Sequence, residues 1–277
     1  PLENDIYGEM VPLLQRIDDQ QAQLKKQNKE LAEAESMRRD FSSNVSHEMK
    51  TPLQVISGYA ELMKNDMVLP EDRQKFAGLI YDEAQAMRGL INDVLTLSKL
   101  DESAFAREER PIDVTSVARR MAGRLESFAA DEGVSISVKG ASAHINGSET
   151  LAEEMLYNLI ENAVRYNHAG GSVSVRVSQG AASEEVLEAL RAAGAEPDPA
   201  SVVTVRVSDT GAGIPEEMRE KVFERFFRLD KSRSKETGGT GLGLAIVKHA
   251  VQYHHGTICV EGAQGEGATF VLRLPAA

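Results

Sequence analysis

A heptad repeat over the first 45 residues is the strongest constraint on how this chain can fold. Positions spaced alternately by four and three residues are mostly apolar: Ile6, Met10, Leu13, Ile17, Gln20, Leu24, Gln27, Leu31, Ala34, Arg38, Phe41 and Val45. Such a stripe is the seam of a left-handed coiled coil, and here it outlasts four heptads. The alternative is one amphipathic helix packed on its own domain. We favour the coiled coil, which implies a parallel homodimer.

The helical periodicity continues beyond this repeat. Apolar residues recur past Pro52 up to Met63, residues 65–70 break the pattern, and a second amphipathic helix is expected over about 71–100. Two antiparallel helices with wide apolar faces cannot bury those faces alone, whereas two copies would form a four-helix bundle. The second segment therefore also favours a dimer.

An alternating pattern of helices and strands begins beyond a charged segment at residues 107–111, which we interpret as a linker. We predict an antiparallel or mixed sheet with helices on one face. The expected helices are 114–130, 151–166 and 244–254, and the expected strands are 134–138, 172–178, 202–208, 257–261 and 268–274. Residues 179–201 interrupt a hairpin and contain a short helix at 183–193, which we interpret as a surface insertion.

Charge and cysteine content exclude several classes of protein. The net charge of −12 argues against broad binding to nucleic acid or to anionic lipid. Cys259 is the only cysteine, which excludes an intrachain disulfide and a cysteine-based zinc site. No run approaches the roughly 18 consecutive apolar residues of a membrane-spanning helix.

The first group of candidate catalytic residues lies where the heptad repeat ends. His47 falls off the apolar seam, so its imidazole should face solvent and could act as a nucleophile. Glu48 could accept a proton from that ring, and Thr51 lies one helical turn further on the same face. Pro52 removes a helical hydrogen bond and should bend the helix.

Residues 46–53 resemble the phosphoacceptor box of the sensor histidine kinases, Ser-His-Glu-x-(Arg/Lys)-Thr-Pro-Leu, at every position of that pattern. The resemblance implies that His47 is phosphorylated from ATP and that Glu48 is the base. It also implies that Thr51 positions water when a partner protein is dephosphorylated.

Two asparagines on a later helix form the second group. Asn158 and Asn162 share one helix face, where their amides could reach a hydrated magnesium ion and phosphate oxygens, with Arg165 nearby. Polar residues on an exposed face are the alternative. The segment resembles the N box of the same family, which implies that Asn158 and Asn162 hold Mg2+ and ATP. Arg165 would then meet phosphate, and Tyr166 would pack beside the adenine.

The third group begins where a predicted strand ends at Asp209. A carboxylate there can accept a hydrogen bond from the adenine amino group, and Gly211 and Gly213 allow the backbone to approach the base. Asp-x-Gly alone is a common turn. In its context the segment resembles the family's G1 box, which extends the implied adenine site to Ile214.

The fourth group combines an aromatic cluster, a basic run and a glycine-rich loop before a helix. Such a loop is a natural phosphate cradle, and Lys231, Arg233 and Lys235 offset the acidity of the chain locally. The segment resembles the F and G2 boxes, which form a mobile ATP lid. By that resemblance Phe223 docks the lid and Arg228 approaches the terminal phosphates. The implied nucleotide loop is Gly239, Thr240, Gly241, Leu242 and Gly243.

The four boxes occur in the family's order between about residues 36 and 275. The resemblance implies an α+β fold: a coiled coil (1–40), a dimeric four-helix bundle with the phosphotransfer histidine (41–106), and a Bergerat-type α/β sandwich that binds ATP (107–277). It implies ATP and Mg2+ as cofactors, and a response-regulator receiver domain as the partner of a homodimer. We expect a cytoplasmic fragment of a receptor anchored in a membrane through a missing N-terminal region.

Three alternatives remain at this stage. ATPases of the gyrase, heat-shock ninety and mismatch-repair group share similar nucleotide boxes but lack the box at residues 46–52. A non-enzymatic scaffold would be expected to lose Asn158, Asp209 or the glycines, and all are present. A protein that acts mainly as a phosphatase is the third, since Thr51 permits dephosphorylation. Two departures from the family pattern are the insertion at 179–201 and Gly147-Ser148, where many relatives carry an acidic residue.

Overall fold

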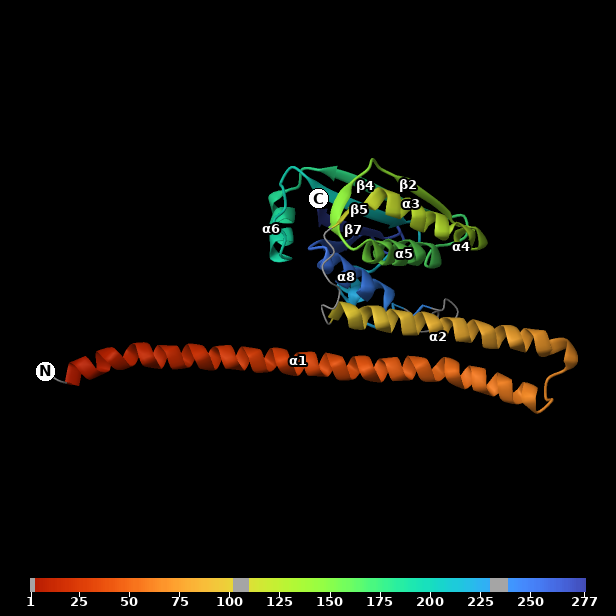
Figure 1. Cartoon of the computed structure of the whole chain (residues 1–277), viewed down its shortest axis with the longest axis horizontal. Coiled ribbons are helices and arrows are strands. Elements are labelled where there is room, and N and C mark those ends of the chain that lie inside the picture. Colours follow the sequence, from red (N-terminus) through yellow and green to blue (C-terminus); the bar gives the residue numbers. More distant parts are fainter. Residues whose placement is uncertain (1–2, 102–109, 230–238) are drawn as a thin grey trace. The chain divides into compact units, whose positions relative to one another are not determined.

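The computed structural model describes residues 3–101, 110–229 and 239–277 (Figure 1). The chain divides into two compact units, residues 1–54 and residues 55–277, which are considered separately. None of the described helices combines the length with the apolar character that a bilayer crossing requires.

The first unit lies within one long helix, α1 (Glu3–Lys64), which runs unbroken through Pro52. Two seam residues of the heptad repeat, Leu24 and Leu31, are 57% and 64% exposed in the single chain. The fold of one chain therefore leaves these apolar seam positions in water, where a second helix would bury them. The coiled-coil dimer and the bend at Pro52 stay predictions.

A helical hairpin opens the second unit. Helix α1 ends at Lys64, and Asp66 adopts a left-handed conformation with φ of 51°. A short 3-10 helix, η1 (Pro70–Asp72), then leads into α2 (Arg73–Asp101). The ring of Tyr59 meets that of Phe76 edge-on, with centroids 5.2 Å apart. The predicted break at 65–70 and the predicted second helix are both confirmed.

A mixed sheet forms the centre of the second unit beyond α2. Among the described residues its strands are β2 (Ser135–Lys139), β4 (Ser172–Gly180), β5 (Val202–Asp209), β7 (Thr269–Pro275) and β6 (Thr257–Glu261), in that spatial order. Among these five described strands, the β2–β4 pair is parallel and the other three pairs are antiparallel. Along β4, buried Val173, Val175 and Val177 alternate with more exposed residues, so one face of the sheet is covered. The predicted mixed sheet is confirmed.

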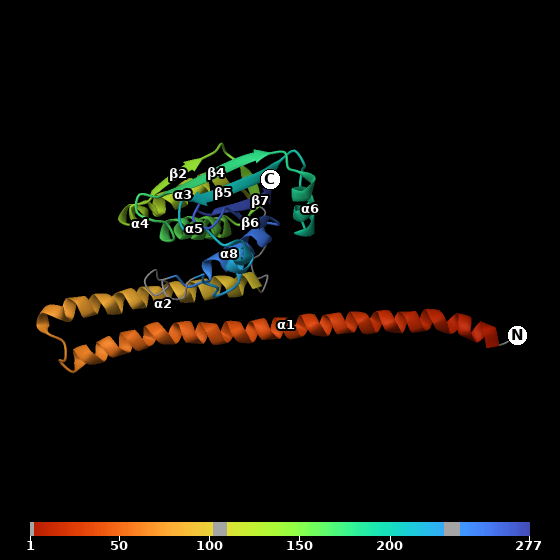
Figure 2. The ribbon, with the colours of Figure 1, turned by 180° about the vertical axis from the view of Figure 1, so that it is seen from behind.

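Helices cover that one face of the sheet. Figure 1 shows α3 (Val114–Arg124) and α5 (Glu149–Arg165) in front of the strands, and the reverse view in Figure 2 shows the strands in front. Helix α8 (Gly243–Tyr253) packs on α5 and completes the layer. Buried side chains of these helices and of the sheet form one core, with Leu156, Leu159 and Ile160 of α5 fully buried.

The predicted helix at 114–130 is two helices. Helix α3 stops before Leu125, and α4 (Glu126–Asp131) follows. The Leu125 N–H bonds the carbonyl oxygens of Met121 and Ala122, both at 3.2 Å. This tightened turn redirects the chain and buries the Leu125 side chain, which is 3% exposed.

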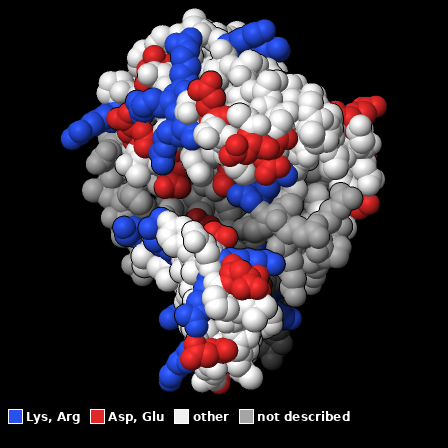
Figure 3. Space-filling model, turned by 90° about the vertical axis from the view of Figure 1, so that its right-hand side faces the viewer, with Lys and Arg blue, Asp and Glu red and all other residues white. Residues whose placement is uncertain are grey.

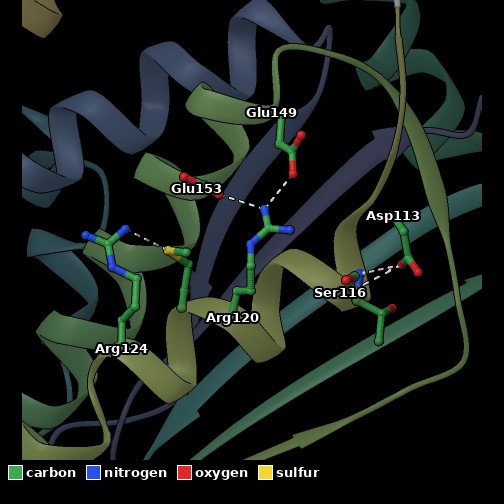
Figure 4. A network of polar contacts seen from close by, with 8 residues as sticks. Asp113, Ser116, Arg120, Arg124, Glu149 and Glu153 are labelled. Atoms are coloured by element: carbon green, nitrogen blue, oxygen red, sulfur yellow. Dashed lines mark hydrogen bonds and ion pairs between the residues drawn. The ribbon is translucent and has the colours of Figure 1, made fainter.

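An arginine joins α3 to α5 at the surface of this layer (Figure 4). One nitrogen of Arg120, Nη2, donates to Glu149 and to Glu153, at 2.6 Å in each case. All three groups are partly exposed, so this network adds only modestly to stability. On the face seen in Figure 3, acidic and basic side chains are interspersed, with no broad field of one sign.

A second, two-stranded sheet was not predicted. Strand β1 (Arg110–Asp113) pairs antiparallel with β3 (His144–Gly147), and buried Ile112 lies opposite buried Ile145. The segment 107–111 is therefore not wholly a linker: residues 110–111 belong to a strand, and 107–109 lie outside the described residues. The strand was not predicted because it contains Pro111, and proline within a sheet is confined to edges and strand ends.

The insertion at 179–201 contains the predicted helix, α6 (Glu184–Ala192). Leu187 and Leu190 of α6 are buried against Ala195 and Val202, in a small cluster separate from the main core. Figure 1 shows α6 at one end of the sheet, apart from α3 and α5. The insertion is thus an ordered element with its own apolar contacts.

A buried histidine connects α8 to the start of α5. His254 Nδ1–H donates to the Ala250 oxygen at 2.7 Å, and its Nε2 accepts the Ser148 N–H at 3.2 Å. Gly147 makes room for the ring, since a Cβ there would lie 2.1 Å from His254 Cδ2. Burial lowers the pKa of His254, so the folded protein keeps this ring neutral.

We predict that the contribution of His254 to the free energy of unfolding falls as the pH is lowered from about 7 to 5. In this window the unfolded chain binds a proton at residue 254 that the folded chain excludes. Urea unfolding followed by circular dichroism should show a weaker pH dependence for His254→Gln. The exposed His168→Gln is the control and should keep the dependence. Equal slopes in wild type and His254→Gln would contradict the assignment.

Candidate functional site

Asn158 lies at the contact between α5 and α8 and is only 9% exposed. Its side-chain Nδ2 donates to the Glu154 carbonyl at 2.8 Å, which orients the amide. The amide oxygen faces the first residue of α8, because a Cβ on Gly243 would lie 2.6 Å from Asn158 Oδ1. Only glycine at position 243 permits this close approach, so the two predicted boxes meet at one point.

Asp209 ends strand β5 and is held by backbone donors on one oxygen. Its Oδ1 accepts the N–H groups of Gly211 at 2.8 Å and Ala268 at 3.2 Å. Burial raises the pKa of the carboxyl, and these two hydrogen bonds act in the opposite direction. With both backbone donors on Oδ1, Oδ2 is left as the acceptor for a ligand amino group.

The turn after Asp209 packs tightly against the end of α5. A Cβ on Gly211 would lie 2.3 Å from the Tyr166 carbonyl oxygen, and a Cβ on Gly213 would lie 2.2 Å from the Ala263 oxygen. Gly213 also has φ of 70°, a conformation that favours glycine. Tyr166 is exposed, and its hydroxyl lies near Gly239. The residue predicted to pack beside the adenine is therefore a neighbour of the glycine loop. Ile214 is buried in the core.

Asn167 ties these parts together and was missed from the sequence. Its Nδ2 donates to the carbonyl oxygens of Ala163 and Ser172, at 3.2 Å each, and its Oδ1 accepts from Thr210 Oγ1 at 3.1 Å. The residue thereby joins the end of α5 to the Asp209 turn. A polar residue directly after the N box was the available signal, but its partner at position 210 is distant in sequence.

The two ends of the predicted lid are joined by a backbone hydrogen bond. The Phe226 N–H donates to the Gly241 oxygen at 2.8 Å, and both residues have positive φ. The predicted lid residues Lys231, Arg233 and Lys235 lie outside the described residues. Arg228, which precedes them, is half-buried.

Besides Ile214, two more of the predicted nucleotide residues are buried in the protein. Phe223 is buried and meets Phe270 edge-on, with ring centroids 6.2 Å apart. The Leu242 side chain is fully buried, so only its backbone could face a ligand. Both side chains therefore pack inside the protein beneath the candidate site.

Arg165 is engaged within the protein. Its guanidinium pairs with Glu161 at 2.7 Å and lies over the Phe128 ring, 5.5 Å from the centroid. Asn162 is half-buried on the same helix, one turn beyond Asn158. Contact between Arg165 and a phosphate stays a prediction.

His47 lies in the first unit, and its side chain is 80% exposed, as its position off the seam predicted. Its Nδ1 lies 3.9 Å from Glu48 Oε1, so the other ring nitrogen, Nε2, points away from this carboxylate. Thr51 Oγ1 lies 3.4 Å from the His47 carbonyl oxygen, to which it donates. The three side chains share one exposed stretch of α1.

These donors suit Mg2+ and ATP. The Asn158 amide oxygen is a hard ligand of the kind that Mg2+ takes together with phosphate oxygens and water. The described residues contain no cluster of three or more carboxylate, histidine or cysteine side chains that could hold a metal ion. The tightly packed glycines at 211, 213 and 243 would bring backbone close to a flat base and its phosphates.

Comparison with known proteins identifies two domains. Residues 37–103 match the model of the His Kinase A (phospho-acceptor) domain. Residues 147–277 match that of the Histidine kinase-, DNA gyrase B-, and HSP90-like ATPase. The chain belongs to the sensor histidine kinases, which are protein-histidine kinases with a phosphoacceptor domain and an ATP-binding domain.

Individual relatives agree with this assignment. The sensor-like histidine kinase SenX3 of Mycolicibacterium smegmatis is 34% identical over 89% of this chain, which spans 59% of that protein. The structure of full-length ShkA in complex with AMPPNP is 28% identical, with a TM-score of 0.58, over 85% of this chain and 45% of that one. The structure of histidine kinase ThkA in complex with the response regulator protein TrrA shows the same fold. It is 21% identical, with a TM-score of 0.62, over 86% of this chain and 61% of that one.

We predict that Gly243→Ala lowers ATP affinity about 10- to 100-fold without unfolding the protein, because the new Cβ would displace the Asn158 amide. The matched control is Gly123→Ala on α3, where nothing lies within 4 Å of the new Cβ. That change should leave affinity intact and stabilise α3 by up to about 1 kcal/mol. Calorimetric titration with ATP measures the affinity of both variants. Equal affinities in the two variants would show that the Asn158–Gly243 contact does not shape the site.

Proposed function

We propose that this chain is the catalytic core of a sensor histidine kinase that phosphorylates itself on His47. The phosphoryl group then passes to an aspartate of a response regulator. One observation carries the proposal: an imidazole 80% exposed, with a carboxylate at its Nδ1 side, lies in a domain that matches the phosphoacceptor family. An ATPase domain follows it in the same chain.

The chemistry follows from this geometry. Glu48 near Nδ1 favours the tautomer with Nδ1–H, which leaves the lone pair on Nε2. Nε2 attacks the γ-phosphorus of ATP, the bond from that phosphorus to the β,γ-bridging oxygen breaks, and ADP leaves. Glu48 accepts the Nδ1 proton as the ring becomes positively charged.

The second unit supplies positioning and charge. Asp209 and the Gly211–Gly213 turn would hold the adenine beside Tyr166, and Asn158 and Asn162 would hold the phosphates with Mg2+. When bound, Mg2+ neutralises charge on the phosphate oxygens. Phosphoryl transfer needs little beyond such neutralisation and in-line positioning, and Arg228 would assist by approaching the terminal phosphates.

The partners of the whole protein are part of the same proposal. Phosphohistidine is a high-energy group suited to relay, and the ThkA structure contains a response regulator. The exposed heptad residues and the phosphoacceptor domain favour a homodimer. The chain spans 59% of SenX3 of Mycolicibacterium smegmatis and 50% of the PhoR protein of Pseudomonas aeruginosa. We infer that its parent protein is a receptor with a membrane anchor and this core in the cytoplasm.

We predict that wild-type protein incubated with γ-labelled ATP and Mg2+ acquires a label that is labile in acid and stable in alkali. His47→Ala should lose this label completely, while His144→Ala, a change at another exposed histidine, should keep it. Asn158→Ala should reduce labelling about 100-fold or more through lost nucleotide binding. ATP hydrolysis with no label on wild type would indicate an ATPase of the gyrase-like class instead.

Thr51 supports a further activity, dephosphorylation of the partner. Its hydroxyl lies one turn beyond His47 and could position water at a phosphoaspartate. We predict that Thr51→Ala keeps autophosphorylation within about twofold and loses about 10-fold or more of the phosphatase rate. Thr51→Ser keeps a hydroxyl and is the matched control. Retained phosphatase activity in Thr51→Ala would exclude this role.

A further inference from the structure

The second half of helix α2 presents one side to the ATPase part of the second unit. Leu90 and Leu97 of α2 are 4% and 0% exposed, and α2 contacts α8. Asp93 lies between these leucines, and the spacing 90, 93, 97 places all three on one helix face. An acidic residue in the middle of a buried apolar stripe is costly, and it serves no step of the proposed reaction.

Asp93 reaches the nucleotide loop directly. Its Oδ2 accepts a hydrogen bond from Thr240 Oγ1 at 2.7 Å, and the same hydroxyl accepts the Leu242 N–H at 3.2 Å. Gly243 follows at once and faces the Asn158 amide. The Asp93 carboxylate is therefore hydrogen-bonded to the loop that leads to Gly243, the residue that faces the candidate Mg2+ ligand Asn158.

Other acidic groups share this region. Burial, opposed by the Thr240 hydrogen bond and reinforced by the charges of Glu154 and Glu161, raises the pKa of Asp93 to about 6. Glu154 and Glu161 flank Asn158 on α5, one turn before it and one turn after it. Asp93 is thus within electrostatic range of the two carboxylates that flank Asn158 on α5.

We infer that Asp93 is a determinant of nucleotide affinity: its negative charge, held at Thr240, opposes binding of the triphosphate at Asn158. The inference rests on the proposed nucleotide site. Like charges in a partly buried site repel strongly, and the repulsion grows with the charge of the ligand. Adenosine, which carries no phosphate, should not sense Asp93, whereas ADP should sense it less than ATP.

The test compares wild type with Asp93→Asn, which keeps an oxygen acceptor for Thr240 and removes the charge. Calorimetric titrations at pH 8 keep Asp93 ionised in wild type. We expect ATP to bind Asp93→Asn about 3- to 10-fold more tightly, ADP less so, and adenosine equally well. Asp82→Asn, an exposed change on the same helix, should match wild type.

Each other outcome is informative. Unchanged ATP affinity in Asp93→Asn, or an equal gain for adenosine, would overturn the inference while leaving the proposed function intact. Weaker ATP binding only when Mg2+ is present would overturn it in favour of Asp93 as a metal ligand. No ATP binding by wild type would refute the proposed nucleotide site, and the inference with it.

Discussion

The nucleotide site depends on the close approach of helices α5 and α8 at Asn158 and Gly243. The Glu154 carbonyl holds the Asn158 amide in one orientation, and the absence of a side chain at position 243 lets α8 begin against the amide oxygen. The fully buried leucines of α5 and the valines of the sheet fix the helix to its layer. Because interiors are closely packed, this one contact fixes where the glycine loop lies relative to the core.

The chemistry is divided between two units of the chain. The candidate nucleophile stands on a helix where it is exposed to water, and the candidate nucleotide ligands are partly buried in a mixed α/β layer. An exposed imidazole keeps its ordinary reactivity, whereas a nucleotide needs fixed donors and glycine backbone. The exposure of His47 thus suits a nucleophile, and the partial burial of the other residues suits a nucleotide site.

Much of the fold could be predicted from the sequence because its signals are local. The helical periods, the alternation in β4 and the glycine boxes each depend on residues close together in the chain. The β1–β3 pair was not predicted, because β1 is short, contains Pro111 and pairs with a strand more than 30 residues away. The break at Leu125 depends on burial of one side chain, which no local pattern reveals.

The candidate site shows the same division. Resemblance to a family identified Asn158, Asp209 and the glycines, but it could not show that Leu242 and Phe223 face the core. Asn167 and Asp93 were missed because their partners, Thr210 and Thr240, are distant in the sequence. The Asp93–Thr240 contact joins residues 147 positions apart. Such contacts follow from the assembled fold rather than from any motif.

The proposed chemistry makes Nε2 of His47 the phosphorylated atom. Phosphorus-31 NMR of the protein after incubation with ATP, combined with mass-spectrometric mapping, identifies both the residue and the ring nitrogen. We predict a single phosphoramidate on Nε2 of His47, since Glu48 lies on the Nδ1 side. A phosphoester on serine or threonine, or a phosphoramidate on Nδ1 or on another histidine, would contradict it.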